Sequence, residues 1–304
     1  MFGKGTKNIL IGCVILLFIL YFSYAHVGYE NFQDSNTMKP KGVIIELIGG
    51  LGNQLYIYAA GRVIQEHLNV PMYLVSSGTV RAHTDVDYRS ILFTDFTPIE
   101  KDDDRMKDKV DVRLHNDFWN SWSMDKLPTD TDKYIYISDQ WFQYFPAIEG
   151  IIPKLRQQFV MILRNKYPDI RIQPRSAFIH VRRGDYTTEQ NNVYLLDIDY
   201  YLKAIDIFKE KENVLNFYVF SDEINWCKKQ NWDTTKNIIY VDEADELKAI
   251  YMMSQCKEGA IIANSTFSSW GAILGPYETG ATIVYPSKWL YNAKTDFPKE
   301  WIKI

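Results

Sequence analysis

Cysteine is scarce in this chain. Only three cysteines occur among 304 residues, and one of them, Cys13, lies in an apolar N-terminal run. A scaffold of several disulfides is therefore excluded, although Cys227 and Cys256 leave room for a single bridge. The sequence also has no Cys-x-x-Cys pair and no Cys/His cluster, so nothing indicates a structural zinc site.

An excess of basic residues is absent too. The formal net charge is −4 and the isoelectric point is near 5.8, which argues against broad neutralisation of a phosphate backbone. We therefore expect no nucleic-acid partner, although one local basic cluster could still hold a single diphosphate. Low-complexity tracts and repeats are missing as well, and 46% of the residues are hydrophobic. A chain of this length and composition can fold as two domains of ordinary size, each with its own core.

The N-terminus predicts a membrane anchor. Lys4 and Lys7 precede an uncharged stretch, residues 9–25, which is just long enough to cross a bilayer as a helix. The lysines favour a cytoplasmic tail, residues 1–8. The polar residues 26–41 read as a stem that joins the anchor to the folded body.

This arrangement would make the chain a single-pass type II membrane protein. Its folded body would lie in the lumen of the Golgi if the cell is eukaryotic, and the chain would otherwise be membrane-associated. The alternative is a cleaved signal peptide, whose apolar region should be shorter and should end in a small-x-small site. Residues 23–25 match such a site only loosely.

Strands and helices alternate through the rest of the chain. An apolar strand, residues 42–48, breaks at a glycine-rich turn and is followed by a helical pattern over 54–68. Between 76 and 132 the periodic signals are weak, and we expect loops and short helices. Such alternation predicts α/β lobes with parallel sheets covered on both faces. The further elements we expect are strands at 70–75, 134–138, 176–181, 216–221, 237–241, 259–263 and 282–285, and helices at 152–166, 200–209, 245–256 and 267–274.

One strand ends in a dense group of charges. Residues 178–186 read Phe-Ile-His-Val-Arg-Arg-Gly-Asp-Tyr, so an apolar strand delivers Arg182, Arg183 and Asp185 into the turn that follows it. Paired guanidiniums at a strand end can clamp a diphosphate through bidentate hydrogen bonds. Alternation puts His180 and Arg182 on one side of the strand, so one arginine could meet a ligand while its neighbour braces the turn. The alternative is a solvated loop held by an Arg–Asp ion pair.

The glycine-rich turn at residues 49–54, Gly-Gly-Leu-Gly-Asn-Gln, raises the question of a dinucleotide site. That interpretation fails because the third glycine position is Leu55 and the next strand ends in residues 75–77 without an acidic residue. A tight turn that directs its backbone amides and Asn53 toward a ligand fits better. A purely structural turn is the alternative.

Polar residues follow two later strands. Ser221 and Asp222 could bind a ribose or a base edge, or could cap the next helix. At residues 264–268, Asn-Ser-Thr-Phe-Ser, a strand gives way to a helix, so free amides, hydroxyls and the positive end of the helix dipole converge there. That arrangement suits a phosphate, and ordinary helix capping is the alternative.

Aspartate pairs that could hold a metal on a diphosphate are poorly placed. Residues 102–104 form an acidic run without a preceding strand and read as solvated. Asp197 and Asp199 directly precede a helical pattern, and we expect Asp199 to cap that helix. With arginines available to balance a leaving diphosphate, we expect neither a metal nor any other cofactor.

These motifs together resemble a known family. The pattern His180-x-Arg182-Arg183-x-Asp185 is similar to the signature shared by α1,2- and α1,6-fucosyltransferases, and its Gly-Asp-Tyr extension resembles the α1,2 group, glycosyltransferase family 11. The runs at 49–54, 220–222 and 264–272 match the same family in the same order. The resemblance spans roughly residues 43–290.

The resemblance implies a GT-B-like fold, in which two Rossmann-like lobes face a cleft. Residues 42–170 would form the lobe on the acceptor side, and residues 171–304 the lobe that binds the GDP-sugar. The implied activity is that of a galactoside α1,2-fucosyltransferase. Such an enzyme moves L-fucose from GDP-β-L-fucose to the 2-hydroxyl of a galactose-type glycan acceptor, with inversion and without a metal.

The resemblance also implies roles for individual residues. Asp185 is the nearest carboxylate that could act as a base, but an arginine-paired acid is a poor one, so the base stays open. Residues 140–144 resemble a segment of the family on the acceptor side. The implied catalytic residues are His180, Arg182, Arg183 and Asp185; the donor-binding residues are Ser221, Asp222, Asn264, Ser265, Thr266, Phe267 and Ser268; and the cleft or acceptor residues are Gly50, Gly52, Asn53, Gln54, Gln140 and Trp141.

Two alternatives share most of these features. One is a fucosyltransferase that acts on another sugar or on a protein hydroxyl. The other is a non-catalytic, membrane-anchored protein that uses the fold to bind a glycan.

Overall fold

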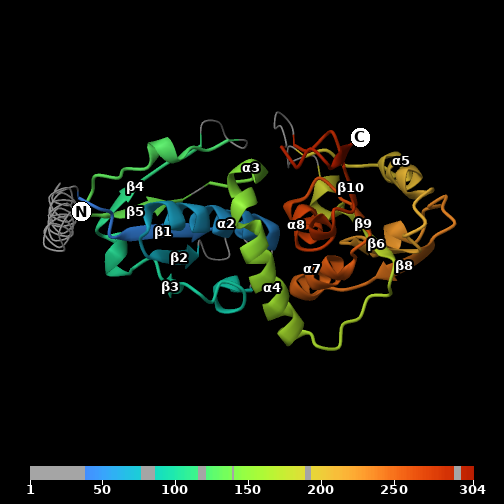
Figure 1. Cartoon of the computed structure of the whole chain (residues 1–304), viewed down its shortest axis with the longest axis horizontal. Helices are drawn as coiled ribbons and strands as arrows, with labels where there is room; N and C mark the ends of the chain where they lie inside the picture. Colours follow the sequence, from blue (N-terminus) through green and yellow to red (C-terminus); the bar gives the residue numbers. More distant parts are fainter. Residues whose placement is uncertain (1–37, 77–85, 116–120, 139, 189–192, 291–295) are drawn as a thin grey trace, which may run out of the picture. The chain divides into compact units, whose positions relative to one another are not determined.

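The computed structural model describes residues 38–76, 86–115, 121–138, 140–188, 193–290 and 296–304 (Figure 1). The expected tail at 1–8, the expected anchor at 9–25 and most of the stem lie outside these residues and stay predictions. Within the described residues, none of the helices combines the length and apolarity needed to cross a membrane. Residues 40–304 pack as one compact unit.

The first lobe is built on a five-stranded, fully parallel sheet. Its central strand β1 is buried along nearly all of its length, as expected for a strand covered on both faces. The strands, in spatial order, are β3 (Thr97–Ile99), β2 (Met72–Ser76), β1 (Gly42–Leu47), β5 (Tyr134–Ile137) and β4 (Lys109–Asp111).

The second lobe is built on a six-stranded parallel sheet. Every residue of its central strand β6 is buried. The strands, in spatial order, are β11 (Ile302–Lys303), β10 (Thr282–Tyr285), β9 (Gly259–Ile261), β6 (Ser176–Val181), β7 (Asn216–Ser221) and β8 (Asn237–Val241).

Helices follow most strands and pack on the sheets. Two of them, α2 and α8, are the next elements after β1 and after β9, the neighbour of β6. The α-helices are α2 (Leu51–Leu68), α3 (Phe145–Ile148), α4 (Ile152–Lys166), α5 (Ile198–Phe208), α6 (Ile224–Cys227), α7 (Glu246–Gln255) and α8 (Thr266–Leu274), with 3₁₀ turns η2 (Tyr88–Ser90), η3 (Asp104–Met106), η4 (Met124–Lys126), η5 (Glu149–Ile151), η6 (Gly184–Thr187) and η7 (Pro276–Thr279).

The largest apolar cluster is shared by the two lobes. It contains buried residues of β1, α2, α4, α7 and α8, among them Tyr58, Phe159 and Trp270. A second cluster lies on the opposite face of the second sheet, where Ala177, Ile179 and Val181 of β6 pack toward α5. Because side chains alternate along a strand, Phe178 and His180 point instead to the α8 face.

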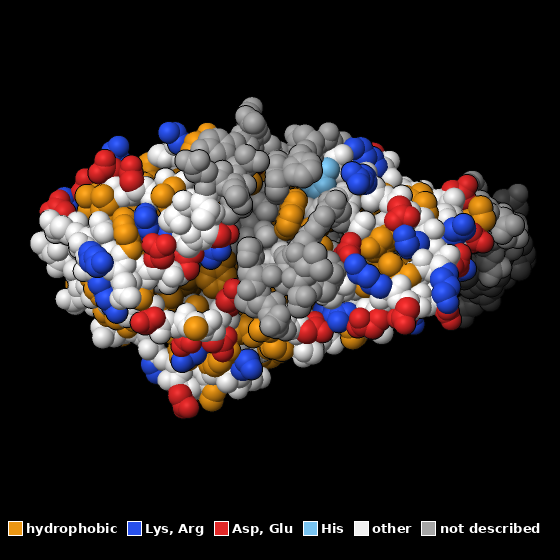
Figure 2. Space-filling model, turned by 180° about the vertical axis from the view of Figure 1, so that it is seen from behind, with side chains coloured by type: hydrophobic (Ala, Val, Ile, Leu, Met, Phe, Trp, Pro, Cys, Tyr) orange, Lys and Arg blue, Asp and Glu red, His pale blue; other side chains and the backbone are white. Residues whose placement is uncertain are grey.

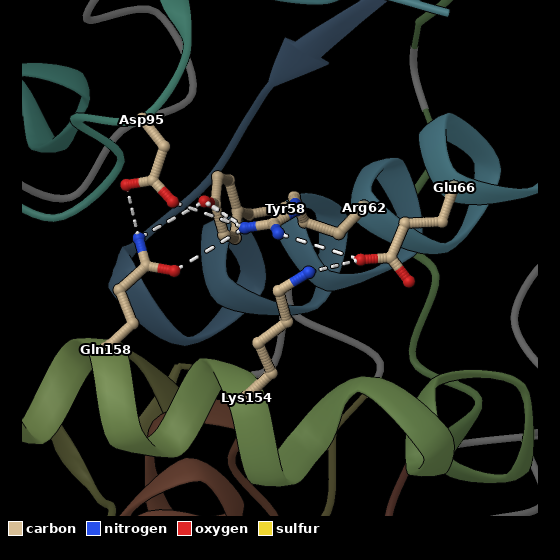
Figure 3. A network of polar contacts seen from close by, with 6 residues as sticks. All are labelled: Tyr58, Arg62, Glu66, Asp95, Lys154 and Gln158. Atoms are coloured by element: carbon tan, nitrogen blue, oxygen red, sulfur yellow. Dashed lines mark hydrogen bonds and ion pairs between the residues drawn. The ribbon is translucent and has the colours of Figure 1, made fainter. Parts of the chain in front are cut away.

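A polar network also ties α2 to α4 (Figure 3). The Arg62 guanidinium is buried and lies 4.9 Å from the Phe96 ring centre. Its Nη1 atom donates to the Tyr58 hydroxyl at 3.2 Å and contacts Asp95 at 3.4 Å. Gln158 of α4 donates to the same Asp95 at 2.7 Å. Helix α4 is thereby fixed to α2 of the first lobe by hydrogen bonds as well as by apolar packing.

The predicted α/β architecture with two parallel-sheet lobes is confirmed. The expected strands and helices were found at the expected places, with ends that differ by a few residues. Two short strands, β3 and β4, fall in the segment where we expected only loops and short helices. The sequence missed them because β3 carries a proline and β4 alternates charged with apolar residues over only three positions.

Two local predictions were wrong. Helix α2 begins at Leu51, three residues before the expected start, so Gly52 and Asn53 belong to its first turn and Gly50 is its N-cap. The cap of α5 is Asp197, whose side chain accepts from the amide of Tyr200, and Asp199 lies inside the first turn. The helix starts two residues earlier than expected, which places the earlier carboxylate in capping geometry.

Each sheet has a point where the strand order reverses. The chain builds β1, β2 and β3 outward and then places β5 on the other side of β1; it builds β6, β7 and β8 outward and then places β9 on the other side of β6. Ligands of open parallel sheets bind beyond the carboxyl ends of strands at such switch points. The described segments there are residues 48–53, 138 and 140–141 in the first lobe, and residues 182–186 and 262–266 in the second.

Candidate active site

The two switch points meet through the first turns of α2 and α8. The Cα of Gly52 lies so close to the start of α8 that an added Cβ would sit 2.5 Å from the carbonyl carbon of Thr266 and 2.7 Å from the Cα of Phe267. About one turn further along the two helices, the Tyr56 hydroxyl and the Ser269 hydroxyl share a hydrogen bond of 3.1 Å. Glycine at position 52 therefore lets two helix N-termini approach to backbone contact.

Asn53 is the polar link at this junction. Its Oδ1 atom accepts from the Thr266 hydroxyl at 2.9 Å and from the Gln143 amide at 3.0 Å. Thr266 is the first residue of α8, and Gln143 belongs to the segment after β5. Asn53 therefore joins both lobes and a third segment through one oxygen atom.

The glycine turn before α2 is held by its own neighbours. Gly49 has a φ of +73°, a left-handed value that favours glycine, and an added Cβ would meet Asn53 Nδ2 at 2.7 Å and the Trp141 ring at 2.9 Å. The buried Gln54 side chain donates back to the Gly49 carbonyl at 2.8 Å. Gln54 thus fixes the turn, while Trp141 and Asn53 lie against it.

Arg182 lies between two carboxylates at the end of β6. Its Nη2 atom is 2.8 Å from Asp185 Oδ1, and its Nη1 atom is 3.1 Å from Asp222 Oδ2. The guanidinium carbon is 5.5 Å from the ring centre of Tyr186. About a quarter of the side chain stays exposed (27%), so a ligand can still reach it.

The Arg183 side chain lies on the other side of the β6 end and is less exposed than that of Arg182. Its Nε atom donates to Glu223 at 3.1 Å, and its guanidinium lies 4.1 Å from the Trp226 ring centre. Its backbone amide donates to Asp222 Oδ1 at 2.9 Å. Arg183 therefore binds the segment after β7 to the end of β6.

His180 is buried on the α8 side of β6. Burial, with a smaller contribution from nearby Arg182, lowers the pKa of His180 to about 3. The ring is therefore neutral at physiological pH and packs 5.5 Å from the ring of Phe267. Its Nδ1 atom has no hydrogen-bond partner among the described residues. His180 can supply a hydrogen bond to a ligand but no charge.

The start of α8 leaves backbone amides unpaired. Ser265 is the N-cap, yet within the described part of the chain no side chain caps this helix, and its first turn holds no acidic residue. The first amides of an α-helix have no intrahelical acceptor, so those of Thr266, Phe267 and Ser268 form a candidate anion site, in which the Phe267 nitrogen lies against the Cα of Gly52. The capping alternative for Asn264 and Ser265 is thus not what the structure shows.

Several expected site residues support the loops instead. The buried Asn264 amide donates to the carbonyls of Tyr194 at 2.7 Å and Trp289 at 2.9 Å. The Ser268 hydroxyl accepts from the amide of Ala263 at 2.9 Å, and Ser221 accepts from the amide of Glu223 at 2.9 Å. These bonds shape the strand ends that the other residues occupy.

Gln140 has a similar supporting position. Its buried amide accepts from the backbone of Leu114 at 2.7 Å and donates to the carbonyl of Val112 at 3.1 Å. The side chain thereby holds the segment after β4. A direct contact between Gln140 and an acceptor stays a prediction.

The charged side chains at the end of β6 carry no net positive charge. Arg182 and Arg183 are two guanidiniums against the three carboxylates of Asp185, Asp222 and Glu223. On the face drawn in Figure 2, acidic and basic side chains are likewise interspersed. The α8 amides therefore supply the positive potential that the side chains lack. The described residues contain no group of three or more His, Cys, Asp or Glu side chains with metal-binding geometry.

Three contributors were not singled out from the sequence. Glu223 and Trp226 hold Arg183, and the parallel pairing of β6 with β7 could have pointed to them, because it brings the two strand ends together. Gln143 carries no signal of its own, since it lies in an irregular segment. Only the structure shows that it reaches Asn53.

The family model described as glycosyl transferase family 11 matches residues 86–304. The chain belongs to glycosyl transferase family 11. The match includes both strand ends of the second lobe and leaves the glycine turn of the first lobe outside it.

Individual relatives agree with the family. The chain is 35% identical over 168 residues to an alpha-1,2-colitosyltransferase of Escherichia coli, across 50% of this chain and 56% of that protein. It is 28% identical over 141 residues to the galactoside 2-alpha-L-fucosyltransferase Sec1 of Mus musculus, across 41% of this chain and 37% of that protein. The aligned region spans about half, or less, of the length of these relatives.

Among solved structures, the fucosyltransferase NodZ from Bradyrhizobium is similar in arrangement. The two chains share 13% sequence identity, with a TM-score of 0.42 over 79% of this chain and 95% of that one.

Proposed function

We propose that the protein transfers L-fucose from GDP-β-L-fucose to the 2-hydroxyl of a galactose-type glycan acceptor, with inversion and without a metal. The observation that carries this proposal is that Arg182 and the uncapped start of α8 follow the neighbouring strands β6 and β9, in a chain of glycosyl transferase family 11. Tyr186 links them, because its ring centre lies 5.5 Å from the Arg182 guanidinium carbon and its hydroxyl donates to the Asn264 carbonyl at 3.1 Å. The guanidinium and the helix start both stabilise the negative charge that a leaving diphosphate develops.

The donor diphosphate would bind across the start of α8. The backbone amides of Thr266, Phe267 and Ser268 would hydrogen-bond to phosphate oxygens, and the exposed part of Arg182 would approach from the end of β6. A polar pair, Ser221 and Asp222, ends the neighbouring strand β7 and would lie toward the nucleoside. These positions all belong to the second lobe.

In the reaction, the acceptor oxygen bonds to the anomeric carbon as the bond from that carbon to the β-phosphate oxygen breaks. GDP leaves with the electron pair, and the acceptor hydroxyl gives up its proton to a base. Each well-placed donor at the leaving group contributes on the order of 3 to 4 kcal/mol to the lowering of the barrier. Asp185 is 2.8 Å from Arg182 and forms an ion pair with it, and the proposal assigns no residue as that base.

The acceptor would lie on the first-lobe side. Trp141 is half-buried and packs beside Gly49, where an aromatic face and the backbone of a tight turn meet. An aromatic face at this place suits the apolar face of a galactose ring.

The decisive assay measures GDP release from GDP-fucose, with and without lactose, in the presence of EDTA. The proposal expects acceptor-dependent GDP release that EDTA leaves intact, together with a fucosylated product. Arg182→Ala should lower turnover by roughly 10²- to 10³-fold, as loss of one charge-stabilising donor does. The matched control is Arg164→Ala, which removes an exposed arginine of α4. Equal turnover of the two variants contradicts the role of Arg182.

A second donor is favoured by one specific observation, the likeness to an alpha-1,2-colitosyltransferase. Colitose is fucose without its 3-hydroxyl, so the same site would differ only in the groups that meet that hydroxyl. A donor panel with both sugars separates the two functions. An acceptor panel of other sugars and hydroxyl-bearing peptides tests the remaining fucosyltransferase alternatives, and GDP binding without turnover of any donor would favour a non-catalytic glycan-binding protein.

We also propose that residues 9–25 anchor the protein in a membrane, with the body on the lumenal or external side. The anchored chain should sediment with membranes and should be released by detergent. Leu17→Arg puts a charge at the centre of the apolar run and should weaken that association, because charge is costly in hydrocarbon.

A further inference from the structure

We propose that Gln143 is a positioning residue for glycosyl transfer, which acts by fixing the orientation of the Asn53 amide at the junction of the two lobes. The inference rests on the proposed function and deepens it. It concerns a residue of the first lobe that lies in the segment 140–144, to which the family resemblance points without giving Gln143 a role of its own.

The first step is the polarity of the Asn53 side chain. Its Oδ1 atom accepts two hydrogen bonds, from Thr266 Oγ1 at 2.9 Å and from Gln143 Nε2 at 3.0 Å. Its Nδ2 atom has no hydrogen-bond partner among the described residues. With its oxygen engaged, the amide presents only donors. It is therefore suited to an oxygen that carries negative charge or a lone pair, such as a phosphate oxygen or a sugar hydroxyl.

The second step is where this amide lies. Asn53 is in the first turn of α2, and Thr266 opens α8, whose amides the proposed function assigns to the diphosphate. The same residue also lies against the Gly49 turn, beside Trp141 on the acceptor side. The donor-only face of Asn53 thus lies between the diphosphate site and the acceptor side, which is where the transferred sugar must pass.

The third step is the unusual backbone that presents Gln143. The preceding residue, Phe142, has a φ of +53°, an unfavourable left-handed value for a bulky residue. Its ring is buried and packs 5.3 Å from Trp122 and 5.1 Å from His115. Apolar packing of the ring therefore holds the segment in a conformation that it would otherwise avoid. Such local strain persists where the surrounding structure imposes it, and it is concentrated at functional sites.

The fourth step is what each partner could do alone. Thr266 can donate or accept through its hydroxyl, so by itself it does not decide which end of the Asn53 amide faces it. In the structure Gln143 presents its amino group to Oδ1, and this second donor beside Thr266 favours the orientation in which Oδ1 faces both partners. Glutamate at position 143 would reverse this preference, because a carboxylate only accepts and would draw Nδ2 away from the junction.

The experiment compares Gln143→Glu with Gln157→Glu, the same chemical change at an exposed position of α4. The readouts are kcat and KM for GDP-fucose with lactose as acceptor, the GDP dissociation constant from calorimetry, and the melting temperature. For Gln143→Glu we expect kcat to fall at least tenfold while the GDP dissociation constant stays within about threefold, because the α8 amides are intact. Gln157→Glu should match the wild type in all readouts.

A second pair keeps the inference testable if Gln143→Glu folds poorly. Thr266→Val removes the other donor to Asn53, and Thr266→Ser retains it. We expect Thr266→Val to lower kcat by about three- to tenfold, the effect of one neutral hydrogen bond, and Thr266→Ser to restore most of it. Combining Thr266→Val with Gln143→Ala should cost less than the product of the single effects, because both act through one oxygen.

The outcomes separate the two proposals. If the wild type transfers fucose and Gln143→Glu equals Gln157→Glu, the positioning role is wrong and the proposed function stands. A parallel loss of kcat and of melting temperature in every variant, without rescue by Thr266→Ser, would show a merely structural residue and would also overturn the inference. If the wild type transfers neither sugar, the proposed function fails and the inference fails with it.

Discussion

Replacing Gly52 with alanine should separate the two helix N-termini that form the candidate site. The new methyl would lie 2.5 Å from the carbonyl carbon of Thr266 and closer still to the amide nitrogen of Phe267, and both are backbone atoms. Ordinary contact requires at least 3.4 Å, so α2 and α8 must move apart by about 1 Å. The Asn53–Thr266 hydrogen bond, now 2.9 Å, would then stretch beyond bonding distance.

The expected effect is larger on activity than on stability. Overpacking costs about 1 to 3 kcal/mol, and alanine in place of glycine within a helix returns up to about 1 kcal/mol, so the net loss is about 0 to 3 kcal/mol. A displacement of about 1 Å between reacting groups can lower turnover by roughly 10²-fold. The assay is kcat for GDP-fucose and lactose, with the melting temperature measured on the same samples.

Gly150→Ala is the matched control, because an added Cβ there meets nothing within 4 Å. It should leave both readouts at the wild-type level. If Gly52→Ala keeps the wild-type kcat, the close approach of α2 and α8 has no part in transfer, and the assignment of the site to their junction is wrong.

Two further predictions concern the second lobe. Between pH 6.5 and about 3 the unfolded chain binds a proton at His180 that the folded chain excludes, since burial lowers the pKa of this histidine to about 3. Stability should therefore fall as the pH falls through that window, by at most about 1.4 kcal/mol per pH unit, and urea unfolding at pH 7 and pH 5 should show a loss that His180→Gln lacks. Asn264→Ala removes the side-chain amide that donates to the carbonyls of Tyr194 and Trp289, and should destabilise the chain by about 2 to 4 kcal/mol in the same unfolding assay. A pH-independent stability, or an Asn264→Ala variant as stable as the wild type, would contradict these two assignments.

Much of the fold could be predicted from the sequence because long buried strands and amphipathic helices carry their own periodicity. The run from Ser176 to Val181 is apolar apart from Ser176 and His180, and the structure buries all six residues in β6. The short edge strands β3 and β4 could not be found this way. Three residues with a proline or alternating charges look the same in a strand as in a loop, and only pairing with β2 and β5 defines them.

The candidate site was predictable in part for the same reason. Parallel strands bring their carboxyl ends to one edge, so Arg182 and Thr266 could be assigned to the same edge of the second sheet from the pattern alone. The contact between the two lobes could not. It depends on Gly52 of one helix fitting the backbone of another, and on Gln143 reaching across from a segment without periodicity. Such contacts between distant segments leave no local trace in a single sequence.

The ion pairs around Arg182 bear on how this site could favour transfer over mere binding. Asp185 and Asp222 form ion pairs with its guanidinium, so a diphosphate that binds there would compete with two carboxylates. That competition shifts toward the ligand as the glycosidic bond breaks, because negative charge then builds on the leaving oxygen. An interaction that strengthens in this way lowers the barrier more than it tightens donor binding. The α8 amides have no competing carboxylate in the first turn of the helix, and they would hold the donor before and during transfer alike. Affinity for GDP should therefore depend mainly on α8, and the rate of transfer mainly on Arg182.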